Sequence, residues 1–364
     1  MPQPYPLQLH IIEPTLANNT GHCHSLVRSL AQAAPECDIT VWANRHAGGL
    51  WRGPGRLQAF FHRHLRRPQA LLLYRRLLRQ PGRMLVATAG STDLVLADWA
   101  APGRIPPHKL FLFVHWLNAK ASKARLLSTI AKRQPNMHIL APTASVAEFF
   151  RSCGFQATVV PYPLELDADP ATASPAAFKH LLVAGGARMD KGFGHVVDLV
   201  IEMGRRGLNW PVVAQISAED RHRRDPALAQ HIERLRAAQY GGLTLHEEAM
   251  SPEAYHALFA GAIAIQPYRA QDFKDRVSGV TLDALRAGAP VVVTDGTWMA
   301  ALVRRFDAGV ATADLSATGL LVAVEQVLNN HAHYAAQARL AAAGVSAEHS
   351  ARRLLDVVLQ RPEP

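Results

Sequence analysis

The feature that most constrains the fold of this chain is a series of short, continuously apolar segments. They lie at residues 110–114, 181–184, 263–266 and 291–294. A strand that is apolar on both faces is buried on both faces, which is typical of parallel sheets covered by helices. The stretches between such segments have apolar residues at helical spacing, as in residues 25–34. The sequence therefore predicts parallel sheets built from repeated strand–helix units.

This pattern runs through the chain twice. In the first half we expect strands at residues 7–12, 39–42, 84–87, 94–97, 110–114, 139–141 and 158–160. In the second half we expect strands at residues 181–184, 212–216, 243–245, 263–266 and 291–294. Residues 164–175, between the two halves, are rich in Pro, Asp, Ala and Ser and are expected to form an interdomain linker.

The repeat predicts an α/β protein with two Rossmann-like, doubly wound domains that face a central cleft. A length of 364 residues agrees with two domains. We expect an N-terminal domain at residues 1–163, completed by a C-terminal helix at 347–360, and a second domain at 176–345. In such sheets ligands bind at the carboxyl ends of the strands, so the loops that follow strands are the places to search for a site.

Composition excludes several classes of protein. The chain has no apolar run near the roughly 18 residues that a membrane-spanning helix needs. Its first residues lack the basic and apolar regions of a signal peptide. Three cysteines, Cys23, Cys37 and Cys153, form no CxxC motif and cannot all pair, which favours a reducing environment. We therefore expect a cytoplasmic protein with no disulfide framework and no metal site.

An acid-free stretch between Asp38 and Asp93 carries the excess positive charge of the chain. It contains ten arginines: Arg45, Arg52, Arg56, Arg63, Arg66, Arg67, Arg75, Arg76, Arg79 and Arg83. Without them the chain holds 29 basic and 29 acidic residues. Interleaved aromatic and aliphatic residues suit a surface that binds anionic lipid headgroups at the inner face of a membrane.

Two other interpretations of this stretch stay open. One is an ordinary pair of helices with solvated arginines. The other is a patch that binds RNA or another polyanion. No nucleic-acid-binding motif accompanies the arginines, so we expect no nucleic-acid partner.

The loop expected after residues 181–184 is rich in glycine and basic residues. It reads Gly185-Gly186-Ala187-Arg188-Met189-Asp190-Lys191-Gly192. Glycine lets the backbone approach a phosphate, a following helix N-terminus favours an anion, and Arg188 and Lys191 add charge. The loop matches neither G-x-G-x-x-G nor G-x-x-x-x-G-K-[ST]. It is therefore either a phosphate-binding loop of another kind or a glycine-rich turn with solvated basic residues.

A second segment, residues 275–292, places two carboxylates around the expected start of a helix. Asp275 precedes the turn at Ser278-Gly279, and Asp283 follows eight residues after the first carboxylate. A helix N-terminus that faces a diphosphate, with a carboxylate able to bind vicinal hydroxyls, suits a nucleotide sugar. The alternative is a Ser278 that only caps the helix and an Asp283 on the surface.

Together the two segments resemble the retaining, family 4-type glycosyltransferases of the GT-B fold. The hallmark of that family is a Glu, seven residues, then Glu-Ala-hydrophobic-x-x-Gly-x-Pro-Val-Val, and Asp275 and Asp283 occupy its two acidic positions. Residues 143–163, 184–192 and 264–268 resemble further segments of the family. The resemblance covers nearly the whole chain and is weak only over residues 40–90.

The resemblance implies roles for the residues that match. Arg188 and Lys191, with Gly186 in the same loop, would hold the donor diphosphate and stabilise the charge that develops as it leaves. His115 would touch the donor sugar. Gly21, in the loop before the first helix, would meet the donor phosphates and the acceptor.

The acidic segment takes the remaining roles. Asp283 would accept hydrogen bonds from the ribose hydroxyls. Asp275, with the backbone around Ser278, Gly279 and Val280, would contact the transferred sugar and the distal phosphate. Among all these residues, the resemblance assigns catalysis to His115, Arg188, Lys191 and Asp275.

The implied activity is transfer of a sugar from a nucleoside-diphosphate sugar to a hydroxyl acceptor, with retention at the anomeric carbon. The acceptor would be a carbohydrate or a lipid-linked molecule, as in polysaccharide biosynthesis. If the arginine-rich stretch binds lipid headgroups, the enzyme would be peripheral to the membrane. No cofactor beyond the nucleotide-sugar cosubstrate and no metal are expected. Two alternatives remain: a nucleotide-sugar epimerase of the same fold, and a non-catalytic nucleotide-sugar-binding protein, suggested by Asp at both acidic positions.

Overall fold

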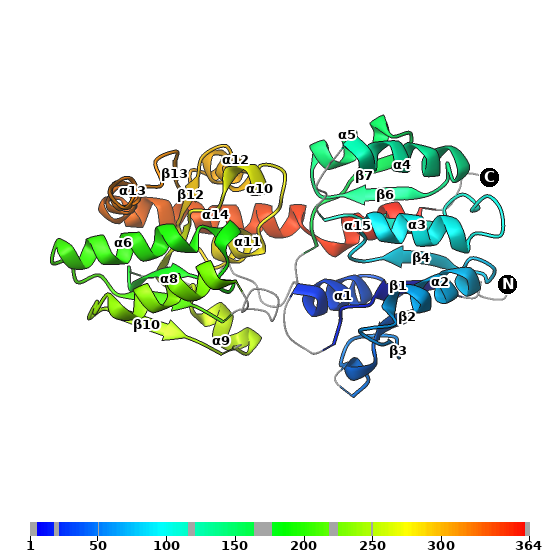
Figure 1. Ribbon diagram of the computed structural model, residues 1–364, viewed down its shortest axis with the longest axis horizontal. Coiled ribbons are helices and arrows are strands. Elements are labelled where there is room, and N and C mark those ends of the chain that lie inside the picture. The colour runs from blue at the N-terminus through cyan, green and yellow to red at the C-terminus, as the bar shows by residue number, and fades with distance from the viewer. Residues whose placement is uncertain are drawn as a thin grey trace. The chain divides into compact units, whose positions relative to one another are not determined.

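The structure is a computed structural model that describes residues 6–17, 22–49, 51–115, 121–163, 177–217, 225–248 and 250–360. The chain forms two compact units (Figure 1). Unit 1 contains residues 1–167 and 348–364, and unit 2 contains residues 168–347. Gly21 and the expected linker at 164–175 lie outside the described residues.

Unit 1 is built on a seven-stranded parallel sheet. Its strands are β1 (Leu7–Glu13), β2 (Cys37–Asn44), β3 (Arg56–Phe61), β4 (Arg83–Val86), β5 (Leu110–Phe113), β6 (His138–Ala141) and β7 (Gln156–Val159). Their order is β3-β2-β1-β4-β5-β6-β7. Every neighbouring pair is parallel. The order reverses at β1, so β1 and β4 flank the switch point where ligands bind in such sheets.

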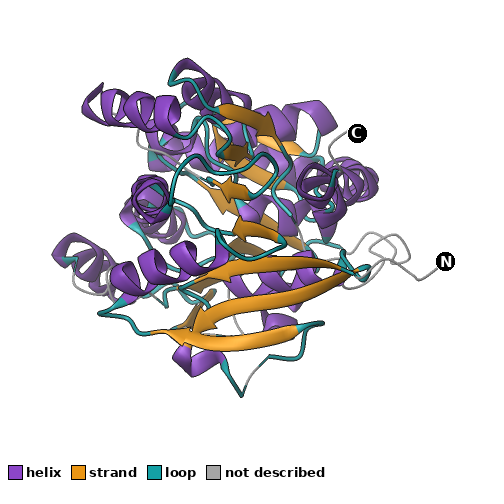
Figure 2. Ribbon diagram, turned by 90° about the vertical axis from the view of Figure 1, so that its right-hand side faces the viewer, coloured by secondary structure: helices purple, strands orange, loops and turns teal. Residues whose placement is uncertain are grey.

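Helices cover both faces of this parallel sheet (Figure 2). They are α1 (His22–Gln32), α2 (Arg66–Leu77), α3 (Ser91–Ala100), α4 (Ala121–Arg133), α5 (Ala144–Ser152) and α15 (Ala351–Leu359), with a 3-10 turn η1 (Arg45–Ala47). Helices α1 and α15 contribute to one apolar core. Helices α2, α3, α4 and α5 contribute to the other. The two cores explain why the central strands are apolar on both faces.

Two elements of unit 1 differ from the sequence-based prediction. Residues 94–97, predicted to be a strand, lie inside helix α3. A short apolar run does not distinguish a buried strand from a buried helix, and the carboxylate of Asp93, which accepts from the Gly90 amide at 2.8 Å, begins a helix here. Strand β3 was not predicted, because it is an edge strand in which three of the six residues are exposed and only Phe61 is buried.

Unit 2 repeats the architecture with six parallel strands. They are β8 (His180–Val183), β9 (Val212–Gln215), β10 (Leu243–His246), β11 (Ala262–Gln266), β12 (Val291–Thr294) and β13 (Gly309–Thr312). Their order is β10-β9-β8-β11-β12-β13, so β8 and β11 flank its switch point. Strand β13 was not predicted. It lies so close to β12 that a Cβ at Gly309 would be 2.0 Å from the carbonyl oxygen of Val291.

The helices of unit 2 also cover both faces of its sheet. They are α6 (Phe193–Arg205), α8 (Pro226–Ala237), α9 (Pro252–Ala257), α10 (Ala270–Phe273), α11 (Gly279–Arg286), α12 (Trp298–Phe306), α13 (Ala317–Asn329) and α14 (His331–Glu348), with a 3-10 turn η3 (Met189–Lys191). One core includes side chains of α6, α8 and α13, and the other includes those of α11 and α12. Among the described residues, no helix is both long enough and apolar enough to span a membrane.

Candidate functional site

The switch point of unit 2 brings together the two segments that the sequence singles out. The chain leaves β8 into the glycine-rich loop and leaves the neighbouring β11 into residues 267–278. The two loops are in contact, because the Arg269 amide donates to the Asp190 carbonyl oxygen at 3.0 Å. A Cβ at Gly192 would lie 1.9 Å from the carbonyl oxygen of Pro267, so glycine is required for this approach.

The glycine-rich loop is held in a left-handed conformation by its neighbours. Gly185 has φ of +85° and Gly186 has φ of +71°, a region that disfavours residues with a side chain. The amides of both glycines donate to Oε1 of the buried Gln215, at 2.8 and 3.3 Å. A Cβ at Gly185 would lie 2.6 Å from Cγ2 of Val280, the second residue of α11. The loop is therefore packed directly against the N-terminal turn of α11.

Lys191 reaches back over this loop. Its ammonium group donates to the carbonyl oxygen of Gly185 and lies 5.7 Å from the ring centre of Tyr268. That distance is within the range of a cation–π interaction, which fixes the position of the charge. Tyr268 is buried, and this burial raises the pKa of its hydroxyl. Lys191 is thus a positioned cation in the loop where the sequence predicts one.

Arg188 belongs to a charge cluster centred on Asp190. Its Nε donates to Oδ1 of Asp190 at 2.8 Å, and its terminal nitrogen donates to Oδ2. Arg276 donates to the same Oδ2 at 3.2 Å. Burial alone would raise the pKa of Asp190, but the bonds from Arg188 and the charges of Arg276 and Lys191 lower it below its usual value. With three cations and one carboxylate, the cluster carries two excess positive charges.

The N-terminus of α11 adds a further positive field to the same edge. Ser278 is the N-cap, and its hydroxyl accepts from the Thr281 amide at 3.3 Å. Gly279 is exposed, and a Cβ there would meet no atom within 4 Å. The space beside Gly279 is therefore open, and a helix N-terminus favours an anion.

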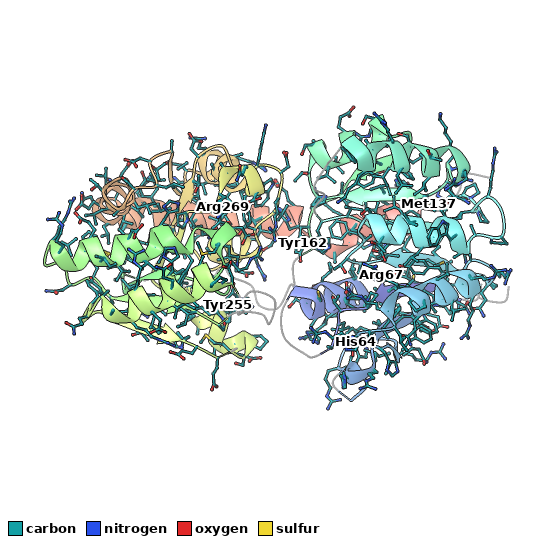
Figure 3. All side chains as sticks on the ribbon, in the orientation of Figure 1. His64, Arg67, Met137, Tyr162, Tyr255 and Arg269 are labelled. Atoms are coloured by element: carbon teal, nitrogen blue, oxygen red, sulfur yellow. The ribbon has the colours of Figure 1, made fainter. Side chains whose placement is uncertain are left out.

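Asp283 lies in the second turn of α11, partly buried against α9. Its Oδ2 accepts from the Tyr255 hydroxyl at 3.1 Å (Tyr255 in Figure 3). Burial raises the pKa of Asp283, although His256, the Tyr255 hydrogen bond and Arg286 act in the opposite direction. The carboxylate keeps acceptor capacity beyond the bond from Tyr255.

Unit 2 thus gathers Gly186, Arg188, Lys191, Ser278, Gly279 and Val280 at one edge of its sheet, with Asp283 further along the same helix. Asp275 is exposed and lies in the segment between α10 and Ser278. His115 is in unit 1, two residues after the end of β5. Its Nε2 is 2.9 Å from the Ala87 carbonyl oxygen, and its ring packs edge-on to Tyr162 with ring centres 5.2 Å apart.

The switch point of unit 1 has a different chemical character. Glu13, the last residue of β1, is fully buried and accepts from the Thr15 amide at 3.0 Å and from the Thr15 hydroxyl. Asp93, at the start of α3, accepts from the Tyr74 hydroxyl at 3.0 Å. Burial raises the pKa of both carboxyl groups. Two carboxyl groups therefore lie where the equivalent edge of unit 2 has cations.

Comparison with solved structures identifies the fold. The Anabaena protein HepE (Alr3699), solved with UDP and glucose, has a TM-score of 0.72 and 14% identity, over 97% of this chain and 99% of that one. A sucrose-phosphate synthase of Thermosynechococcus elongatus has a TM-score of 0.68 and 12% identity, over 97% and 96%. WaaG, a glycosyltransferase of lipopolysaccharide biosynthesis, has a TM-score of 0.65 and 14% identity, over 97% and 100%.

This chain has the GT-B fold. The predicted fold class, two Rossmann-like α/β domains with parallel sheets, is confirmed. No protein-family model matches the sequence, and no curated protein matches it. At 10–14% identity the likeness shows the fold, and the activity has to be argued from the residues.

Several residues of the GT-B switch points were not predicted from the sequence. Asp190 and Gln215 hold the glycine-rich loop, Tyr255 holds Asp283, and Glu13 lies at the edge of unit 1. The sequence could have indicated Gln215 and Glu13 as site residues, since both are polar residues at the carboxyl end of a predicted strand. Tyr255 gave no such signal, because its partner lies 28 residues away.

Proposed function

We propose that the protein is a glycosyltransferase that moves a sugar from a nucleoside-diphosphate sugar to a hydroxyl acceptor, with retention at the anomeric carbon. The single observation that carries the proposal is the cationic switch point of unit 2. There Lys191, Arg188 and Arg276, which together exceed the charge of Asp190 by two, lie beside the N-terminus of α11. Fixed cations beside an open helix N-terminus are a site for a diphosphate.

The same arrangement supports the chemistry of transfer. The bond between the anomeric carbon and the diphosphate oxygen breaks, and negative charge develops on the leaving diphosphate. Lys191 and the N-terminus of α11 stabilise that charge, and we assign Arg188 to the same task. The acceptor oxygen forms the new bond to the anomeric carbon and passes its proton to the departing phosphate oxygen, so no protein nucleophile is needed.

The remaining roles follow from the family resemblance. We assign Asp283 to the ribose hydroxyls, and Asp275 and His115 to the transferred sugar. The nucleotide sugar is a cosubstrate, and we propose no metal. HepE has been solved with UDP-glucose, and WaaG acts in lipopolysaccharide biosynthesis, which supports a nucleotide-sugar donor and a glycan or lipid-linked acceptor for this chain.

A donor panel tests the proposal. Pure protein is incubated with UDP-, GDP- and ADP-sugars, with and without mixed glycan and lipid-linked acceptors, and release of free nucleoside diphosphate is followed. We expect release from one class of donor, stimulated by an acceptor, and a product with the anomeric configuration of the donor. A change of sugar configuration without acceptor would instead indicate an epimerase. Donor binding without turnover would indicate a non-catalytic binding protein.

A further inference from the structure

The acid-free stretch of unit 1 exposes most of its arginines, and they do not lie on one element. Nine of the ten are exposed, whereas Arg83 is buried and donates to the Val358 carbonyl oxygen. Arg56 is neutralised by Asp38, with both contacts at 3.0 Å. The stretch is therefore not a uniform basic patch, and Arg83 in particular is structural.

The exposed arginines are densest around α2. Six of them lie in or beside this helix: Arg63, Arg66, Arg67, Arg75, Arg76 and Arg79. Helix α2 packs against α3, and the two lie side by side in Figure 1. Figure 3 labels Arg67, which belongs to the first turn of α2.

Exposed apolar side chains occupy the same two helices. Trp99 is 65% exposed, Leu72 is 64% exposed and Leu65, the N-cap of α2, is 54% exposed. Trp99 is the only exposed tryptophan within the described part of the chain. Between the helices runs an open groove of about 400 Å³, lined by Arg67, Pro68, Leu71, Thr92, Val95, Leu96 and Trp99.

Acidic groups are withdrawn from this surface. Helices α2 and α3 are described over their whole length, and their only two carboxylates are on α3. Asp93 is half-buried and bonded by Tyr74, and Asp98 is buried and paired with Arg133. The exposed face of α2 and α3 thus combines uncompensated positive charge with exposed apolar groups.

We infer that the face formed by α2 and α3 docks on an anionic lipid bilayer. The arginines contact lipid headgroups, while Trp99, Leu65 and Leu72 enter the boundary between headgroups and acyl chains. Tryptophan favours this boundary because its ring is apolar and its N–H finds a polar partner there. A soluble polyanion would use the arginines but would leave the exposed Trp99 and Leu72 in water, so the bilayer accounts for both kinds of residue.

Co-sedimentation of the full-length protein with vesicles tests this inference. We expect the wild type to pellet with phosphatidylglycerol vesicles at low salt, to be released by high salt, and to stay in solution with phosphatidylcholine vesicles. The double variant Arg67→Gln/Arg75→Gln should weaken the partition by about thirtyfold, at about fivefold for each arginine. Trp99→Ala should weaken it by about tenfold.

Matched controls distinguish an effect of the α2–α3 face from a general effect of lost positive charge or lost apolar surface. The double variant Arg305→Gln/Arg353→Gln removes two exposed arginines elsewhere, and Leu340→Ala removes an exposed apolar side chain of α14. Both should pellet like the wild type. Circular dichroism melting of every variant verifies folding.

Three outcomes would overturn the inference. The first is equal partition onto neutral and anionic vesicles, or none onto either. The second is equal loss of binding in the control pair and the test pair. The third is binding that dextran sulfate displaces and that Trp99→Ala does not change, because this combination identifies a site for a soluble polyanion.

Discussion

The two units share one architecture but have opposite electrostatic character at their switch points. In unit 2, Arg188, Asp190 and Lys191 belong to the loop between β8 and α6, and Arg276 donates to Asp190 from a neighbouring loop. In unit 1, the equivalent edge holds Glu13 and a half-buried Asp93. The bonding follows the same division: Asp190 is paired with arginines and has a lowered pKa, whereas burial raises the pKa of Glu13.

The difference shows how one fold presents two kinds of binding site. A diphosphate beside the buried Glu13 and the half-buried Asp93 would meet like charge in a medium of low dielectric. Hydroxyl groups, in contrast, can donate to carboxylates. The charges therefore support the proposal that unit 2 binds the phosphate-bearing substrate, and they suit unit 1 to a hydroxyl-bearing one.

Removal of Lys191 should have the largest effect. Lys191→Ala is expected to lower kcat by about 10²–10³-fold, because a fixed cation stabilises charge that develops on the leaving diphosphate. Lys179→Ala, an exposed lysine of the same unit, should turn over normally. Steady-state kinetics at saturating donor decide the matter, and near-normal turnover of Lys191→Ala would exclude the assigned role.

Asp283→Asn should act on binding more than on chemistry. We expect the donor KM to rise by about tenfold and kcat to change little, because contacts to the ribose are similar in the ground and transition states. The control is Asp198→Asn, which changes a carboxylate of α6 that is paired with Arg234 of α8. If Asp283→Asn binds nucleoside diphosphate as tightly as the wild type, Asp283 does not contact the ribose.

Glu13→Gln should stabilise the protein at pH 7–8. The folded-state pKa of Glu13 lies above its usual value of 4.5, so its contribution to stability is full below that value and is lost as the pH rises through the folded-state pKa. Glutamine does not ionise and keeps an acceptor for Thr15. Urea unfolding at several pH values should show an advantage of the variant that grows above pH 4.5 and vanishes below it.

Asp190→Asn is the matched test in unit 2, and it should change the stability in the opposite direction. The folded-state pKa of Asp190 is below its usual value of 3.8, so its stabilisation is present above that pH and is lost as the pH falls. The variant should therefore be less stable than the wild type at pH 7, and Arg188 and Arg276 should repel each other. If Glu13→Gln and Asp190→Asn changed the stability at pH 7 in the same direction, the electrostatic contrast between the units would be contradicted.

Tyr255→Phe should give the smallest effect. The variant loses only the 3.1 Å hydrogen bond from the neutral Tyr255 hydroxyl to Asp283, and the carboxylate stays in place. We expect the donor KM to rise by about threefold with kcat unchanged, in the same direction as Asp283→Asn. A larger effect on kcat than on KM would contradict the view that Tyr255 acts by positioning Asp283.

The sequence predicted most of the fold because apolar runs and capping residues are local signals. A cap at Ser278 was one of the two interpretations of its segment, and its hydroxyl accepts from the Thr281 amide. Local signals failed at α3, where a four-residue apolar run fits either element, and at β13, whose pairing with β12 depends on a glycine.

The candidate site was predictable in its position but not in its internal contacts. The glycine-rich loop and the start of α11 follow neighbouring strands, so their proximity follows from the topology. The pairing of Arg276 with Asp190 joins residues 86 apart, and the burial of Glu13 depends on the packing of unit 1. No pattern of residue types encodes such contacts, because they arise only when the chain is folded.

Calorimetric titration of UDP, GDP and ADP into the wild type and Lys191→Ala tests the donor assignment most directly. We predict that one of the three binds the wild type, that the monophosphate of the same base binds at least tenfold more weakly, and that Lys191→Ala weakens binding of the diphosphate at least tenfold. Absence of binding for all three would contradict the account. The account would also be contradicted if Lys191→Ala left the affinity for the diphosphate unchanged while Glu13→Gln abolished it.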